Sequence, residues 1–129
     1  PSTNPQSNAR GVATIFAELA HQLMNARAPS VLPASLLRDA ITARSDGLDL
    51  VVGRPTKFGL GLQLSQPDRP LGVSANAFGH YGNGGHIGFG DPDLGLGFAY
   101  HMNHQGFAWR DPRNIVLVDA VYAAIGETR

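Results

Sequence analysis

The segment from Phe78 to Gly88 is rich in glycine and contains two histidines, so its residue types could do chemistry. Glycine at this density indicates tight backbone turns, or a backbone that a ligand or a neighbouring element approaches closely. Two interpretations are open: an irregular hairpin crossing, or a ligand-facing edge of a sheet. The segment is not a phosphate-binding loop, because neither Gly-x-x-x-x-Gly-Lys-Ser/Thr nor Gly-x-Gly-x-x-Gly occurs here between a strand and a helix.

The five histidines of the chain suggest a metal site, but their spacing argues against one. Residues three apart on a strand point to opposite faces, so His101 and His104 cannot both reach one ion while a strand continues between them. His80 and His86 are separated by glycine turns, and Asp91 is the only obvious nearby carboxylate. The chain has no cysteine, which excludes a thiolate site. We therefore expect neither metal ligands nor a cofactor.

No serine in the chain has the partner that a nucleophile needs. A serine nucleophile requires a base within hydrogen-bond reach. None of the seven serines belongs to a Ser-x-x-Lys pattern, and the only lysine is Lys57. The pattern Gly-x-Ser-x-Gly is absent as well. The amine of Pro1 could act as a base, but the residues after it are polar and loop-like instead of opening a strand.

Helices are predicted at both ends of the chain. Asn8 caps a helix over residues 9–24, a shorter helix follows Pro33, and a last helix starts at Asp111 and stops at Gly126. Each carries apolar residues at helical spacing. The residues expected to face inward are Val12, Ile15, Phe16, Leu19 and Leu23, then Leu36, Leu37, Ala40 and Ile41, and finally Ile115, Val118, Val121, Tyr122 and Ile125.

Between these helices the pattern changes to short apolar runs broken by Gly, Pro and Asp, which is typical of strands and turns. We predict strands at residues 48–52 and 58–64, separated by a turn at residues 53–56. The polar stretch 65–76 is predicted to be a loop.

A hairpin is predicted next, with strands at residues 85–90 and 95–102 around the turn signal Asp91-Pro92. In its second strand large side chains alternate with glycine, alanine and histidine, so the two faces differ. The large residues that share one face are Leu96, Phe98, Tyr100 and Met102. The other face is small enough to accept a helix or another backbone.

Length and composition place these elements in one globular unit of the α+β class, an antiparallel sheet flanked by helices. The chain has 129 residues, 43% of them hydrophobic, and a formal net charge of +0. A neutral surface argues against nucleic acid and anionic membranes as partners, and no apolar run approaches the roughly 18 residues of a membrane span. Because the sequence begins with Pro1, we expect a processed product or a piece of a longer protein.

The run over residues 78–103 strongly resembles the C-terminal region of serine hydrolases related to class C β-lactamases. In that family a segment F-G-H-x-G-x-G-G is followed by a G-F-x-D-P hairpin and a G-F-x-Y-x-x-N strand. The resemblance extends to residues 8–11, 58–61 and 111–113, and it covers about residues 8–125. It implies that the whole chain, as a domain or a fragment, is the C-terminal part of a β-lactamase-like fold.

The resemblance also implies site residues. His80-Tyr81-Gly82 matches the family's third motif, which is Lys-Thr-Gly in the lactamases and His-x-Gly in many esterase-like relatives. The backbone N–H of Asn83 would then help to form the oxyanion hole, and His80 would stand where the lactamase lysine does. His80 and Asn83 are thus the implied catalytic residues, and His80, Tyr81, Gly82 and Asn83 the substrate-binding edge. Histidine in place of that lysine favours an ester or peptide substrate over a penicillin.

The family's first motif, Ser-x-x-Lys, has no match in this chain. Tyr81-Gly82-Asn83 fits the second motif, Tyr-x-Asn, but lies inside the third, so we interpret that match as a coincidence. The resemblance therefore implies a partner, the N-terminal part of the same hydrolase with the nucleophilic serine, and a small acyl substrate such as an ester, amide or β-lactam. The alternative is a non-catalytic module that binds a partner or ligand along the glycine-rich edge.

Overall fold

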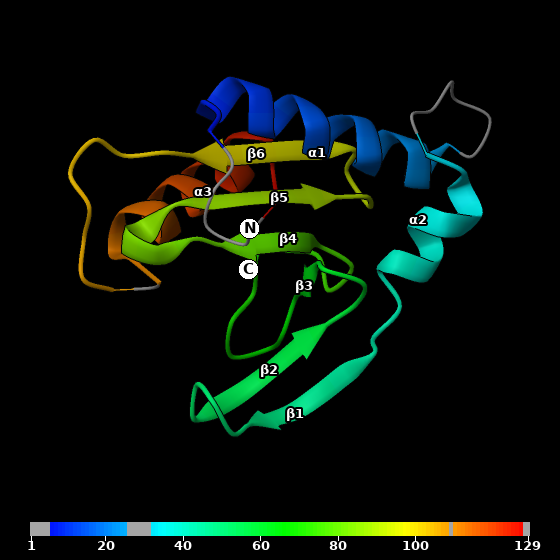
Figure 1. Cartoon of the computed structure of the whole chain (residues 1–129). Coiled ribbons are helices and arrows are strands. Elements are labelled where there is room, and N and C mark those ends of the chain that lie inside the picture. The colour runs from blue at the N-terminus through cyan, green and yellow to red at the C-terminus, as the bar shows by residue number, and fades with distance from the viewer. Residues whose placement is uncertain (1–5, 26–31, 109, 128–129) are drawn as a thin grey trace.

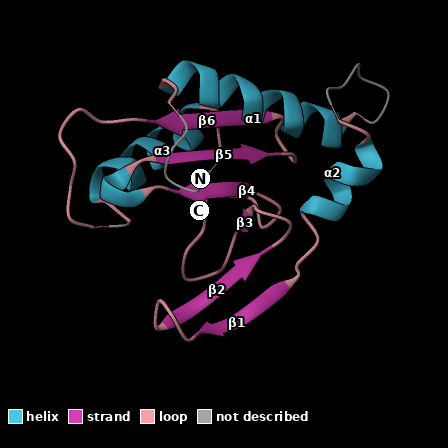
Figure 2. Cartoon of the chain, in the orientation of Figure 1, coloured by secondary structure: helices cyan, strands magenta, loops and turns pink. Residues whose placement is uncertain are grey.

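The computed structural model of the chain describes residues 6–25, 32–108 and 110–127 (Figures 1 and 2). Within these residues three α-helices, six strands and one 3-10 turn are formed. The helices are α1 (Ala9–Met24), α2 (Ala34–Ala40) and α3 (Pro112–Ala124), the strands are β1 (Ser45–Asp49), β2 (Arg54–Phe58), β3 (Gln63–Leu64), β4 (Phe78–Tyr81), β5 (Ile87–Asp91) and β6 (Leu96–Tyr100), and the 3-10 turn is η1 (Asn83–Gly85).

The six strands form one antiparallel sheet in the order β1-β2-β3-β4-β5-β6, so every strand pairs with its neighbour in sequence. Helix α1 crosses one face of the sheet over β5 and β6, and α3 lies behind the other face (Figure 1). This architecture confirms the prediction of an α+β fold with an antiparallel sheet flanked by helices. Among the described residues, no helix is long and apolar enough to cross a membrane.

Helix α1 packs directly on the backbone of β5 and β6, because glycine occupies the positions beneath it. A Cβ on Gly97 would lie 2.2 Å from the backbone nitrogen of Ala17 and 2.4 Å from the carbonyl oxygen of Ala13. A Cβ on Gly90 would lie 2.9 Å from the carbonyl oxygen of Phe16. The prediction that the small face of the hairpin accepts a helix is therefore confirmed.

The hydrophobic core fills the opposite side, between the sheet and α3. The rings of Phe89 and Tyr122 are stacked, with centroids 6.4 Å apart, and the Tyr122 hydroxyl donates to Oδ2 of the buried Asp91 (2.6 Å). Full burial of one such side chain stabilises the fold by about 1.5–3 kcal/mol. The buried members of this core are Leu71, Ala77, Tyr81, Ile87, Phe89, Val118 and Tyr122.

The predicted helices are confirmed with their caps. At the start of α1, the side-chain oxygen Oδ1 of Asn8 accepts a hydrogen bond from the N–H of Gly11 (2.9 Å). Predicted inward faces are correct at Leu37, Val118 and Tyr122, which are buried. They are wrong at three positions, because these helices lie on the sheet and keep one side in solvent. The three side chains that are about half exposed are Ile15, Leu36 and Ile125.

The first hairpin differs from its prediction. Strand β1 ends at Asp49 and β2 begins at Arg54, so the apolar run of residues 50–52 is the turn and not a strand. The Asp49 carboxylate accepts from the N–H groups of Val51 (2.8 Å) and Val52 (3.1 Å), which stabilises a turn. Gly53 closes it with φ +67°, and the following three residues are extended instead of forming the predicted turn.

The second predicted strand also differs, because the chain turns at Gly61 (φ +75°) between β2 and the short β3. Residues 65–76 are irregular apart from an isolated bridge between Gln66 and Arg69, which confirms the predicted loop. The β5–β6 hairpin is confirmed, with the Asp91 carboxylate accepting from the N–H of Asp93 (3.1 Å) in its turn.

Replacing Gly97→Ala tests the contact between α1 and the sheet. The added methyl meets the backbone of α1, which has no side-chain rotamer to relieve the overlap, so α1 must move away. We expect a loss of about 1–3 kcal/mol in the free energy of unfolding, measured by denaturant titration. The control is Gly11→Ala in the first turn of α1, where a Cβ comes no closer than 3.0 Å to the exposed Ser7 hydroxyl. An equal loss in both variants would contradict this account of the interface.

An ion pair at the start of α3 makes the free energy of unfolding depend on pH in the acidic range. Both carboxylate oxygens of Asp111 accept hydrogen bonds from Arg113, which lowers the pKa of Asp111 from 3.8 to about 2. Because the folded-state pKa lies below the unfolded value, the ionised group stabilises the fold above about pH 4, and this stabilisation is lost as the pH falls toward about 2.

We expect Asp111→Asn, which keeps the helix cap but not the charge, to melt at a lower temperature than the parent at neutral pH. The difference in Tm, followed by circular dichroism, should shrink as the pH falls toward about 2. The control is Asp68→Asn, in the exposed loop. We expect its difference in Tm from the parent to show no such decrease at low pH. A Tm difference that stays constant from neutral to acidic pH would contradict the assignment.

Candidate active site

A cleft of about 720 Å³ opens beside the end of β4, on the same side of the sheet as α1. Its walls come from the residues before and in α1, from β4 and the turn after it, and from the chain that follows β6. The residues that line it are Gln6, Ser7, Val12, Phe16, His80, Gly82, Asn83, His86, Ile87, Gly88, His101 and Gln105. Three of the five histidines therefore meet in one cleft, with no carboxylate among the described residues that line it.

His80 presents an imidazole edge to this cleft from β4. It pairs with Gly88 of β5 and is exposed, and its ring centroid lies 5.8 Å from that of Phe58. Its Nδ1 lies 2.5 Å from the carbonyl oxygen of Tyr81. Because a carbonyl only accepts, Nδ1 carries the hydrogen, and in the neutral ring Nε2 is left with a lone pair that can accept a proton.

The chain turns sharply after β4, and the backbone of this turn, at Gly82 and Asn83, lines the cleft. Gly82 donates its N–H to the carbonyl of His86 (2.7 Å), and Asn83 then opens η1. N–H groups in the first turn of a helix have no acceptor inside it. Gly84 follows in the left-handed region (φ +81°, ψ +4°), a backbone sequence that directs successive N–H groups toward one concavity where an anion can bind.

The turn is held from behind by α3 and by the chain after β6. The fully buried Asn114 donates from Nδ2 to the carbonyl of Gly85 (2.9 Å), and Gly106 donates its N–H to the carbonyl of Gly84 (2.9 Å). Arg113 donates to the carbonyl of His104 (2.9 Å), which secures the loop that covers the turn. The position of η1 is therefore fixed by groups outside the cleft.

Tyr81, which the sequence placed in the substrate-binding edge, does not line the cleft. Its side chain is buried in the core on the other face of the sheet, and its hydroxyl donates to the carbonyl of Pro70 (2.6 Å). Of the four residues named from the sequence, the structure brings His80, Gly82 and Asn83 together. Tyr81 supports them from the core through its position in β4.

His86 and His101 are cleft residues that the sequence analysis did not assign. Their rings meet edge to face, with centroids 5.2 Å apart and an interplanar angle of 87°. The pKa of His101 is lowered, first by burial and then by the neighbouring His86. The predicted hairpin contained the information needed to bring these two histidines together, because each is the next residue beyond the registered pair Ile87 and Tyr100. Among the described residues, no group of three or more His, Cys, Asp and Glu could hold a metal ion.

One serine, Ser7, lines the cleft, and its hydroxyl bonds to the carbonyl of Asn8 (3.4 Å). It belongs to no Ser-x-x-Lys pattern. The cleft can therefore bind and polarise an oxygen through backbone N–H groups and exchange a proton at His80. The nucleophile of an acyl transfer would have to come from elsewhere.

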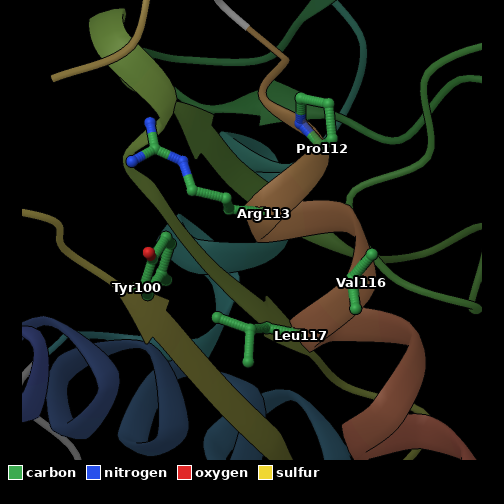
Figure 3. A pocket seen from close by; sticks show the side chains of 5 residues that line it. All are labelled: Tyr100, Pro112, Arg113, Val116 and Leu117. Atoms are coloured by element: carbon green, nitrogen blue, oxygen red, sulfur yellow. The ribbon is translucent and has the colours of Figure 1, made fainter. Parts of the chain in front are cut away.

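A smaller hollow of about 420 Å³ lies on the other side of β6, against the first turns of α3 (Figure 3). It is mainly apolar, and the residues that line it are Tyr100, Pro112, Arg113, Val116 and Leu117. Arg113, whose guanidinium is paired with Asp111, is the only charged residue among them. The described residues that line this hollow include no carboxylate and no imidazole.

Solved structures of two kinds resemble this chain. A penicillin-binding protein homolog from Caulobacter crescentus is 35% identical, with a TM-score of 0.82 over 92% of this chain and 32% of its own. EstA from Arthrobacter nitroguajacolicus Rue61a is 30% identical, with a TM-score of 0.78 over 93% of this chain and 32% of its own. A family VIII carboxylesterase is 28% identical, with a TM-score of 0.75 over 91% of this chain and 31% of its own.

The chain thus spans about a third of the length of these three proteins. No curated protein matches it. The family model described as Beta-lactamase matches residues 1–123, nearly the whole sequence. The fold, the solved structures and this match agree, and the chain belongs to the beta-lactamase family.

Proposed function

We propose that this chain is the C-terminal portion of a serine hydrolase that cleaves an ester, amide or β-lactam through an acyl-enzyme. It contributes the His80-Tyr81-Gly82 motif and the backbone N–H of Asn83 to the active site, and the strand that carries this motif, β4, is an inner strand of the sheet and not the expected edge strand. The nucleophilic serine and its lysine partner come from the N-terminal part of the same hydrolase, which is the partner that this chain requires. The proposal needs neither a metal nor a cofactor.

The observation that carries this proposal is the joint position of His80, Gly82 and Asn83 at one cleft. Asn83 begins a 3-10 turn two residues after the end of β4, and β4 pairs with a strand on each side. A preorganised backbone N–H that binds the developing oxyanion stabilises the transition state of acyl transfer by about 3–4 kcal/mol. Such a donor needs no movement when the charge develops.

The solved relatives support the same reaction class. One is a penicillin-binding protein homolog and another is a family VIII carboxylesterase. Because this chain spans about a third of each, there is room in such a protein for the missing Ser-x-x-Lys segment. Histidine at position 80, in place of a permanently charged lysine, favours an ester or peptide substrate over one that carries a carboxylate.

The first test is intact mass spectrometry of natively purified material, before and after incubation with a fluorophosphonate probe. We expect a second polypeptide, carrying Ser-x-x-Lys, to gain the adduct while this chain does not. A single unlabelled species at 13.7 kDa would contradict the proposal and favour the alternative, a non-catalytic binding module.

Asn83→Pro tests the role of the backbone N–H in the hydrolase assembled from both parts. Gly82 is extended (φ −89°, ψ +156°), as a residue before proline must be, and proline fits the first position of a helical turn. The substitution therefore removes the N–H with little strain. We expect kcat to fall about 10²- to 10³-fold.

The matched control is Asn83→Ala, which removes the side chain but keeps the N–H. We expect this variant to retain most of the parent kcat, with both variants melting close to the parent. Equal kcat values for the proline and alanine variants would show that the N–H of Asn83 does not bind the oxyanion.

A further inference from the structure

His86 and His101 form a cross-strand pair at the end of the β5–β6 ladder. The last registered pair is Ile87 with Tyr100, and each histidine is the next residue beyond this pair on its side of the hairpin. Both are half-buried, and both line the cleft on the α1 side of the sheet. The end of the ladder therefore brings the two rings together, with centroids 5.2 Å apart.

We propose that His86 and His101 bind a divalent transition-metal ion, with Zn²⁺ as the reference ligand, at the wall of the cleft. Two imidazoles that share a tetrahedral Zn²⁺ through bonds of about 2.0–2.1 Å place their ring centroids about 5 Å apart. The observed separation of the two centroids is 5.2 Å. The rings now meet edge to face, and rotation about the terminal bond of either side chain, a soft torsion, turns a nitrogen toward the ion.

The wall of the cleft around the pair holds few ionisable groups. His80 is the only other titratable group that lines the cleft among the described residues. With two protein ligands, the ion keeps positions open toward the cleft for water or for an oxygen of a bound molecule.

This site is independent of the proposed hydrolase function, because it needs no nucleophile and no second polypeptide. Binding is measured on the 129-residue chain itself, with zinc chloride as the probe. If the chain does not bind zinc, the proposed hydrolase function is not affected. If no second polypeptide is labelled by the fluorophosphonate probe, the proposed zinc site is not affected.

The test is isothermal titration calorimetry of the chain with zinc chloride near pH 7.5 and near pH 5. We expect one ion to bind at the higher pH and binding to weaken at the lower one, because protons compete with the metal ion for the imidazole nitrogens. Loss of a group that merely supports a ligand costs about 10–100-fold in affinity, so His86→Gln and His101→Gln should each weaken binding at least about tenfold. Thermal melts establish that both variants are folded.

The control is His104→Gln, in the exposed loop after β6, which should bind zinc as the parent does. A second measurement locates the ion: Ni²⁺, which broadens nearby NMR signals, should affect the amides around residues 86 and 101 first. The proposal is overturned if the parent does not bind zinc, if the double variant of His86 and His101 binds as tightly as the parent, or if His104→Gln weakens binding as much as either single variant.

Discussion

The closeness of α1 to the sheet is the constraint on which the cleft depends. Helix backbone lies on strand backbone because Gly90 and Gly97 present no side chain to it. Val12 and Phe16 of this helix consequently reach over Gly88, where a Cβ would lie 2.7 Å from Cγ1 of Val12. The same two side chains line the cleft. Of the segment 78–88, for which a hairpin crossing and a ligand-facing edge were both open interpretations, Gly88 thus accommodates a packed helix, and the side chains of that helix form part of the wall of the cleft.

The opposite face sets the position of the turn that carries Asn83. Helix α3 contributes Tyr122 to the core and Asn114 to the carbonyl of Gly85, so one rigid element holds the sheet and the turn together. Gly85 lies so close to the cap of this helix that a Cβ would be 2.6 Å from Cβ of Asp111. Loss of a buried hydrogen bond that leaves a carbonyl without a partner costs about 1–3 kcal/mol. The bond from Asn114 therefore fixes the position of the turn.

Much of this fold could be predicted from the sequence because local signals agree with the tertiary structure. The caps at Asn8 and Asp111 and the alternation in β6 needed no distant contact to be recognised. The first hairpin was placed wrongly because Leu50, Val51 and Val52 are apolar yet lie in an exposed turn, held by side-chain bonds to Asp49. The cleft could not be predicted in full, because its walls meet only through the packing of α1, β4 and the chain after β6.

The polar groups of the cleft are of two kinds. Backbone groups have positions that the sheet fixes, and imidazoles have positions that depend on side-chain conformation. The N–H of Gly82 is donated to the carbonyl of His86, and the backbone of Asn83 follows from β4, which pairs with β3 on one side and β5 on the other. The position of the Asn83 N–H does not depend on a nucleophile, since no side-chain rotamer has to be selected. The imidazoles of His80, His86 and His101 instead depend on the rotamers of their side chains. The same cleft therefore combines a backbone group that the sheet holds in place with imidazoles that can change their orientation around a ligand.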